Sequence, residues 1–390
     1  MISPIGRRGF VTGLAATAAL GALPAGEALA ARPAYRGPNV IIVRFGGGVR
    51  RLETIHPEYS FAPFLRHRLA PRGVLFPAMR IADGEDIVTS HGEGTLYTLT
   101  GRYEKYVDKS GATFGNQFEA SVPTLFEYLR KAYALAPHEA LLVNGEDRRD
   151  EEFFTFGNHR NFGIRYRSEV LSLYRFKTYL LRRKIAAREG TDKELAAMAK
   201  KLKKLEAFDY RRIDARGQTR AIEGFWSRWR AQYGDSGLKN PRGDRLLTEL
   251  AVRAIRELAP KLLMVNYQDP DYVHWGNASH YTRSIAIIDQ GIARLVETVA
   301  ATPGYRGNTV FVVVPDCGRD ANPLLRVPYQ HHFNTRSAHE IWALIAGPGI
   351  AKGAVVDKTT DQTQIAATVG RIMGFPTAHA ESRLLQDAFA

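Results

Sequence analysis

Short apolar runs alternate along this chain with longer segments of helical period. The runs "NVIIVRF", "ALLVN", "LLMVNY", "TVFVVV" and "WALIA" are rich in leucine and β-branched residues and predict buried strands. Between them, apolar residues spaced three and four apart predict helices over 121–135, with Ser121 as the cap and Pro123 in the first turn, and over 279–300. This alternation predicts an α/β fold, a three-layer sandwich whose mainly parallel central sheet is covered on both faces.

The middle of the chain departs from this alternation. Residues 165–204 contain 13 Lys or Arg against 4 Asp or Glu, at helical spacing. We therefore predict a basic helical insertion over 164–244, between two parts of the α/β core at 31–163 and 245–390. A solvated, charged hairpin explains such a segment. The alternatives are a basic lid over an anionic substrate and a surface that binds a polyanion or a membrane.

Charge and the N-terminal segment give expectations about partners and location. The 390 residues carry 54 Lys and Arg against 40 Asp and Glu, so the net charge is +14, which attracts anions. Residues 1–30 contain Arg7 and Arg8, then an apolar run too short and Gly-rich to span a membrane, and end in Ala-Leu-Ala. This pattern is typical of a twin-arginine export signal. We expect a periplasmic or exported protein with no nucleic-acid partner.

Metal-ligand types of side chain follow two of the predicted strands and recur in a third cluster. They are Asp269, Asp271 and His274; then Asp316 and Cys317, with Arg319 and Asp320 close behind; then His331, His332 and His339. In open parallel sheets, ligands bind beyond the carboxyl ends of the strands. Carboxylate, imidazole and thiolate groups bind zinc and similar ions. The pattern predicts a divalent metal site, although Arg319 and Asp320 also fit a salt bridge that orders their loop.

A fourth segment, "TSHGEGTLYTLT", places small and hydroxylated residues before an apolar run. A loop that enters a helix at this point aims backbone N–H groups at an anion. Ser90, His91 and Thr95 are therefore candidates for a nucleophile, or for positioning water, beside the metal.

Taken in order, these motifs resemble the alkaline phosphatase superfamily, and within it the sulfatase-like, twin-arginine-exported proteins of unknown function. The motifs are "NVIIVRFGGGVRRLET", "TLYTLTGRYE", "DPDYVHWGNASHYTRSIAIIDQGIARL", "TVFVVVPDCGRDAN", "HH" and "ALIAGPGI". The resemblance implies two metal ions about 4 Å apart, which clamp the attacking and leaving oxygens of phosphoryl or sulfuryl transfer. It implies that Asp271, His274 and either His331 or His332 hold the first ion, with His339 as a further candidate.

The resemblance also implies a degraded second metal site. Glycine stands where the family has an aspartate after the first strand, and Asp316-Cys317 replaces an Asp-His pair. His91 stands at the family's nucleophile position. Cys317 could serve as a thiolate ligand. We therefore expect one or two divalent ions, with zinc as the expected metal and the second site weak or empty.

Three functions are consistent with these features. The first is a periplasmic, metal-dependent hydrolase of phosphate or sulfate esters, acting on an anionic small molecule. The second is a catalytically inactive relative that serves as a binding or assembly protein of the cell envelope. The third is a protein that binds a polyanion or a membrane surface through its basic helices.

Overall fold

The computed structural model describes residues 32–104, 119–145, 150–157, 162–209, 219–238, 243–274, 276–322, 324, 328–331 and 335–390. The predicted export signal at 1–30 and the candidate ligand His332 lie outside these residues.

The centre of the described chain is an eight-stranded sheet with the strand order β5-β4-β6-β1-β7-β8-β2-β9. Its strands are β1 (Asn39–Phe45), β2 (Gly73–Phe76), β4 (Ala140–Asn144), β5 (Glu169–Leu171), β6 (Leu262–Asn266), β7 (Thr309–Pro315), β8 (Ala343–Ala346) and β9 (Ala354–Val355). β8 runs antiparallel to β7 and β2, and the other pairs are parallel. β3 (Met79–Arg80) and β10 (Thr360–Asp361) form a separate parallel pair. The prediction of a mainly parallel central sheet is confirmed.

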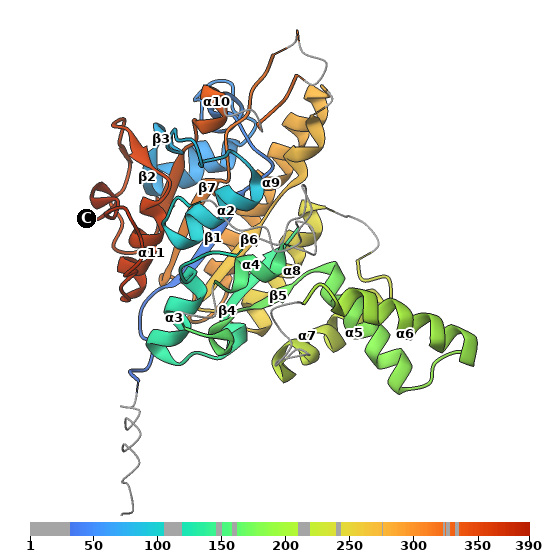
Figure 1. The fold of residues 1–390 in the computed structure, drawn as a ribbon. Coiled ribbons are helices and arrows are strands. Elements are labelled where there is room, and N and C mark those ends of the chain that lie inside the picture. Colours follow the sequence, from blue (N-terminus) through green and yellow to red (C-terminus); the bar gives the residue numbers. More distant parts are fainter. Residues whose placement is uncertain are drawn as a thin grey trace, which may run out of the picture.

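Helices cover both faces of this sheet (Figure 1). They are α1 (Arg51–Thr54), α2 (His91–Thr100), α3 (Leu125–Tyr133), α4 (Glu151–Thr155), α5 (Leu173–Ala186), α6 (Asp192–Glu206), α7 (Arg220–Tyr233), α8 (Asp244–Glu257), α9 (Ala278–Ala301), α10 (Arg336–His339) and α11 (Gln364–Met373). Side chains alternate along β1: Val40 and Ile42 join the core under α2, α3 and α11, whereas Ile41 and Val43 join the core under α8 and α9. The three-layer arrangement follows from this alternation.

The helix predicted over 121–135 begins later than the sequence pattern indicated. α3 starts at Leu125, and its cap is Thr124, whose backbone N–H and hydroxyl both donate to the Glu127 carboxylate. Ser121 lies outside the helix and bonds to Glu104 through its backbone N–H and its hydroxyl. Pro123 therefore precedes the cap instead of occupying the first turn. The predicted helix over 279–300 corresponds to α9.

The range 164–244 contains both sheet and helix. β5 pairs with β4 as an edge strand of the central sheet, and α7 places Phe225, Trp226 and Trp229 in the core beside α8. α5 and α6 form a hairpin that projects away from the sheet (Figure 1). α6, which is described along its whole length, buries none of its side chains. Among the described residues, no helix is both long enough and apolar enough to cross a membrane.

Candidate metal centre

Three adjacent strands deliver the candidate side chains to one edge of the sheet. β6, β1 and β7 are neighbours and run parallel, so Asn266, Arg44 and Val314 lie side by side in register. The loops that follow β6 and β7 carry Asp271 and Asp316. Because the carboxyl ends of parallel strands coincide, residues distant in the sequence meet there.

Four side chains converge in front of this edge. His91 Nε2 and His274 Nε2 each lie 2.8 Å from Asp271 Oδ1, and His331 Nε2 lies 3.3 Å from the same oxygen. His331 Nε2 also lies 3.2 Å from His274 Nε2. The cluster joins the first residue of α2, the loop after β6 and the segment before α10. It brings together the sequence-predicted residues His91, Asp271, His274 and His331.

The spacing of these donors fits a single divalent ion. Zinc binds imidazole nitrogen at about 2.0–2.1 Å, so two ligands of a tetrahedral ion lie about 3.3 Å apart. The separations of 3.2 and 3.3 Å match this spacing, and the two of 2.8 Å are shorter. All four donor atoms lie within 4.8 Å of one another. Two imidazole nitrogens 3.2 Å apart also need either a shared proton or a shared cation. The donor set of three imidazoles and one carboxylate is typical of zinc.

Hydrogen bonds orient two of the three imidazoles toward the centre. His331 Nδ1 lies 3.1 Å from the carbonyl oxygen of Thr89, which can only accept, so Nδ1 carries the proton and Nε2 presents its lone pair. His91 Nδ1 likewise donates to the Asp316 carboxylate, whose Oδ2 lies 2.6 Å away, and His91 Nε2 faces Asp271. A carbonyl or carboxylate behind a metal-binding imidazole is the usual arrangement in metalloproteins.

Electrostatics keep both carboxyl groups ionised. Burial opposes the charge on Asp316, but Arg44 and then His91 hold its pKa well below the usual range. Burial likewise opposes the charge on Asp271, and His91 and its other imidazole neighbours hold its pKa far below the usual range. The pKa of His91 is raised well above its usual value, because the attraction of the two carboxylates exceeds the effect of burial. In the metal-free protein, a proton on His91 therefore links the two acids.

The centre opens to solvent on the side of Asp271, whose side chain is 36% exposed, whereas His331 is fully buried. Behind Asp271 lies the buried guanidinium of Arg319. It donates to Asp271 Oδ1 over 3.3 Å and to the carbonyl oxygens of Gly47, Gly48 and Tyr329. The ion pair of Arg319 is thus with Asp271. Its sequence neighbour Asp320 accepts a hydrogen bond from Ser337 instead.

The remaining predicted site residues occupy different places. Ser90 is the N-cap of α2: its hydroxyl accepts from the Glu93 backbone N–H and donates to the Glu93 carboxylate. Thr95 is buried and bonds to the His91 carbonyl over 2.6 Å. Cys317 is buried beside Asp316; burial and then the Asp316 charge raise the pKa of its thiol to about 12, which disfavours the thiolate. His339 lies apart from the cluster and contacts the Ile81 carbonyl.

Arg44 is a residue of the site that sequence reasoning missed. Its guanidinium comes from the last residue but one of the fully buried strand β1 and lies 3.4 Å from Asp316 Oδ2. One signal was present in the sequence: an arginine inside a seven-residue apolar strand needs a buried partner. The partner could not be named from the sequence, because Asp316 lies 316 − 44 = 272 positions further along the chain.

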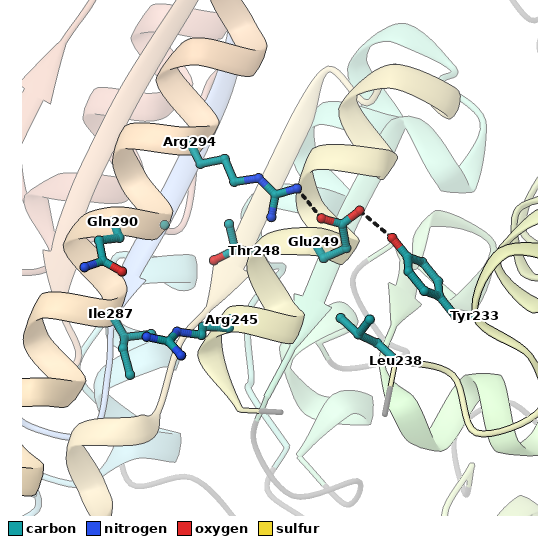
Figure 2. Close-up of a pocket in the computed structure, with 9 residues that line it drawn as sticks. Tyr233, Leu238, Arg245, Thr248, Glu249, Ile287, Gln290 and Arg294 are labelled. Carbon is teal, nitrogen blue, oxygen red and sulfur yellow. Dashed lines mark hydrogen bonds and ion pairs between the residues drawn. The ribbon is translucent and has the colours of Figure 1, made fainter. Parts of the chain in front are cut away.

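A separate cavity of about 320 Å³ lies beside α8 and α9 (Figure 2). Arg294 and Tyr233 both bond to the Glu249 carboxylate in its wall, and Arg245 and Gln290 also face it. Among the described residues, none of the four clustered donors lines this cavity. It is therefore distinct from the candidate metal centre.

Comparison with known proteins gives structural matches without sequence matches. No family model and no curated protein sequence matches the chain. A mutant of the alkaline phosphatase PafA is similar in structure with a TM-score of 0.59 at 12% identity, covering 92% of this chain and 100% of that one. An alkaline phosphatase superfamily protein from Vibrio parahaemolyticus gives 0.53 at 13%, covering 92% and 72%. A putative sulfatase from Bacteroides thetaiotaomicron gives 0.53 at 13%, covering 90% and 74%.

These matches cover 90–92% of this chain. At sequence identities of 12–13%, such matches show the fold of this chain and not its substrate. The resemblance drawn from the ordered motifs predicted the same arrangement. The chain therefore has the fold of the alkaline phosphatase superfamily.

Proposed function

We propose that this protein is an exported, metal-dependent hydrolase of phosphate or sulfate esters. The observation that carries the proposal is the convergence of His91, Asp271, His274 and His331 at the carboxyl edge of a sheet with this fold. The paired Arg7 and Arg8 of the N-terminal segment support export. The net charge of +14 supports an anionic substrate.

The four clustered residues would hold the ion, and zinc is the ion that their donor atoms favour. Such an ion, when bound, polarises an ester oxygen and lowers the pKa of a bound water. The chain itself contributes orientation: Asp316 fixes His91, and the Thr89 carbonyl fixes His331. The buried guanidinium groups of Arg44 and Arg319 add positive potential for an anionic ester.

The first test is the variant Asp271→Asn, because Asp271 Oδ1 contacts all three imidazoles. Losing a charged metal ligand should remove the bound ion and lower turnover of aryl phosphates and aryl sulfates by at least about 100-fold. Mutating a residue that only hydrogen-bonds to a metal ligand typically costs about 10–100-fold, and losing the ligand itself should cost more. Metal content and turnover are measured on the same preparations.

Asp269→Asn is the matched control, since Asp269 lies in the same loop but bonds to the backbone N–H of Asp244 at the start of α8. It should retain the metal and the turnover. Equal loss in both variants, or full turnover in Asp271→Asn, would contradict the proposal.

A second candidate is a catalytically inactive relative that acts as a binding or assembly protein of the cell envelope. The observation that favours it is the number of donors: four protein ligands are typical of a closed structural zinc site, whereas catalytic sites keep an open position. Wild-type protein that binds its metal yet fails to turn over a broad panel of phosphate and sulfate esters would support this candidate over the hydrolase.

The basic hairpin supports a further partner, an anionic membrane surface or polyanion. A groove of about 410 Å³ between α5 and α6 is lined by apolar residues and by Lys177, Lys184 and Lys201. The acids Glu194 and Asp235 also line it, and Asp235 pairs with Lys184. Burial and the neighbouring Lys201 lower the pKa of Lys177. Lys177 and Lys201 thus repel each other, and an anion bound between their ammonium groups would relieve that repulsion.

This proposal predicts salt-sensitive binding to vesicles that contain an anionic lipid. Binding should weaken when Lys200, Lys201 and Lys204 are changed to Gln. The matched control changes three exposed basic residues of the core instead, Arg36, Lys352 and Arg371. Equal weakening in both triple variants would mean that net charge alone drives the binding. Vesicle binding that is as strong in the variant of Lys200, Lys201 and Lys204 as in the wild type would contradict the proposal that the hairpin binds anionic surfaces.

A further inference from the structure

A second group of possible metal ligands lies beside the first. It consists of His91, Asp316 and Cys317, and the resemblance of the motifs implies an ion at this place. His91 belongs to both groups, with Nε2 facing the first and Nδ1 facing Asp316. Whether this second group fits an ion depends on what already surrounds Asp316.

The Asp316 carboxylate is already fully engaged within the described residues. Its Oδ1 accepts from the backbone N–H groups of Gly48, at 3.1 Å, and Cys317, at 2.8 Å. Its Oδ2 accepts from Gly47 N–H at 3.3 Å and from His91 Nδ1 at 2.6 Å. A carboxylate has about four lone-pair sites, so these four donors use them. A second ion would have to displace one of these donors.

The loop after β1 leaves no room for another carboxylate. A Cβ at Gly46 would lie 2.0 Å from the Tyr267 carbonyl oxygen, and one at Gly47 would lie 2.4 Å from the Asp271 backbone nitrogen. Gly47 and Gly48 also have φ values of +84° and +65°, a region that side-chain-bearing residues rarely adopt. The loop is therefore built to bring backbone N–H groups to Asp316 rather than to supply a ligand.

A fixed positive charge already lies beside Asp316. The Arg44 guanidinium is 1% exposed, and its Nη1 lies 3.4 Å from Asp316 Oδ2. Nη1 also donates to Thr95 Oγ1 over 2.8 Å, and Nη2 donates to the Tyr267 carbonyl over 2.9 Å. Thr95 belongs to α2 and Tyr267 to the loop after β6, so hydrogen bonds to two further elements fix the position of the Arg44 guanidinium.

We infer that the centre takes one cation only, and that the Arg44 guanidinium permanently supplies the positive charge that a second cation would bring. Asp316 is then a positioning residue for His91 and not a metal ligand. The inference rests on the proposed function, because it takes the first cluster as the metal site.

The charges of the site agree with this assignment. Asp271 and Asp316 carry two negative charges, and the buried Arg44 and Arg319 carry two positive charges. One divalent ion leaves a net positive centre, which suits a phosphate or sulfate ester. A second divalent ion would find no unpaired acid among the described residues of the site, and burying an uncompensated charge is strongly unfavourable.

The experiment measures zinc stoichiometry and position in the full-length wild-type protein. Elemental analysis and calorimetric titration should give one equivalent, and anomalous scattering should place it among His91, Asp271, His274 and His331. Two equivalents, or an ion between Asp316 and Cys317, would overturn the inference and leave the proposed hydrolase standing. No bound zinc would overturn the metal centre itself and with it the proposed function.

A variant tests the role of the guanidinium directly. Arg44→Gln removes the charge, so the protein loaded with one equivalent of zinc should bind inorganic phosphate about tenfold more weakly or worse, whereas Arg44→Lys should retain most of the affinity. Arg130→Gln is the matched control, because Arg130 is also a buried arginine but bonds to carbonyl groups away from the site. Unchanged phosphate affinity in Arg44→Gln would overturn the role of Arg44. Should that variant fail to fold, the wild-type stoichiometry and ion position still decide between one cation and two.

Discussion

His91 shows how much of the site depends on the contacts of a single side chain. The sequence offered Ser90, His91 and Thr95 as candidates for a nucleophile or for positioning water, and the family resemblance placed His91 at the nucleophile position. In the structure, the two nitrogens of His91 lie between Asp316 and Asp271, whereas Ser90 caps α2 and Thr95 bonds to Arg44 and to the His91 carbonyl. The geometry therefore favours His91 as a ligand. The role of nucleophile then falls to a water or hydroxide in the proposed hydrolase.

Glu93, in the first turn of α2, makes a prediction about stability and pH. Burial raises its pKa from 4.5 to about 7, against the opposing effects of its hydrogen bond and of His91. Between pH 4.5 and 7 the folded state therefore binds more protons than the unfolded state, so stability should fall as pH rises through this window. The fall is on the order of 3 kcal/mol. Glu93→Gln should lack this part of the pH dependence, as measured by urea unfolding of metal-free protein.

The control for this measurement is Glu58→Gln, which changes an exposed carboxyl group. It should leave the pH dependence as in the wild type. If Glu93→Gln and wild-type protein show parallel curves from pH 4.5 to 7, the raised pKa of Glu93 is wrong.

At the scale of elements, the order of the strands explains why the site forms. β6, β1 and β7 are consecutive in the sheet although β1 precedes β6 by more than 200 residues in the chain. The loop after each of these strands contributes different groups to the site. The loop after β6 carries Asp271, the loop after β7 carries Asp316, and the glycine loop after β1 brings backbone donors to Asp316. Substituting these glycines would push the three loops apart.

The hairpin of α5 and α6 should be the least protected helical part of the described chain. α6 buries none of its side chains, so its stability depends on the hairpin contact and on its capping box of Thr191 and Glu194. Thr191→Ala should destabilise α6 by about 1 kcal/mol and speed amide exchange over 192–206 about fivefold. Exchange in β1 should not change, and Thr191→Ser should behave as the wild type. Identical exchange in Thr191→Ala would show that α6 is held by something other than its cap.

For the whole molecule, metal binding should appear as added stability. Zinc at 100 times its dissociation constant should stabilise the folded state by about 2.7 kcal/mol, which raises Tm by several degrees. The gain should shrink in acid, because the ion must displace the proton that the two carboxylates hold on His91. Thermal unfolding with chelator and with zinc measures the effect. Asp271→Asn should show no zinc-dependent shift; an equal shift in that variant would place the ion elsewhere.

Much of the fold was predictable because its signals are local. The apolar runs identified β1, β4, β6, β7 and β8, and the helical period identified α9. The start of α3 was placed too early because Ser121 and Pro123 are both common at helix starts, and only the structure shows that Glu104 engages Ser121. β5 lay hidden in the basic region because it is only three residues long.

The sequence by itself determined the α/β architecture and the set of side chains available for metal binding, since both follow from residue type and spacing along the chain. Only the tertiary structure decided which of these side chains meet. It joined His91 to Asp271, His274 and His331, set His339 apart, and placed the Arg44 guanidinium against Asp316. The physical reason is that the donors of one ion must lie within a few ångströms of each other, and such distances depend on strand order and loop path, which no local pattern encodes.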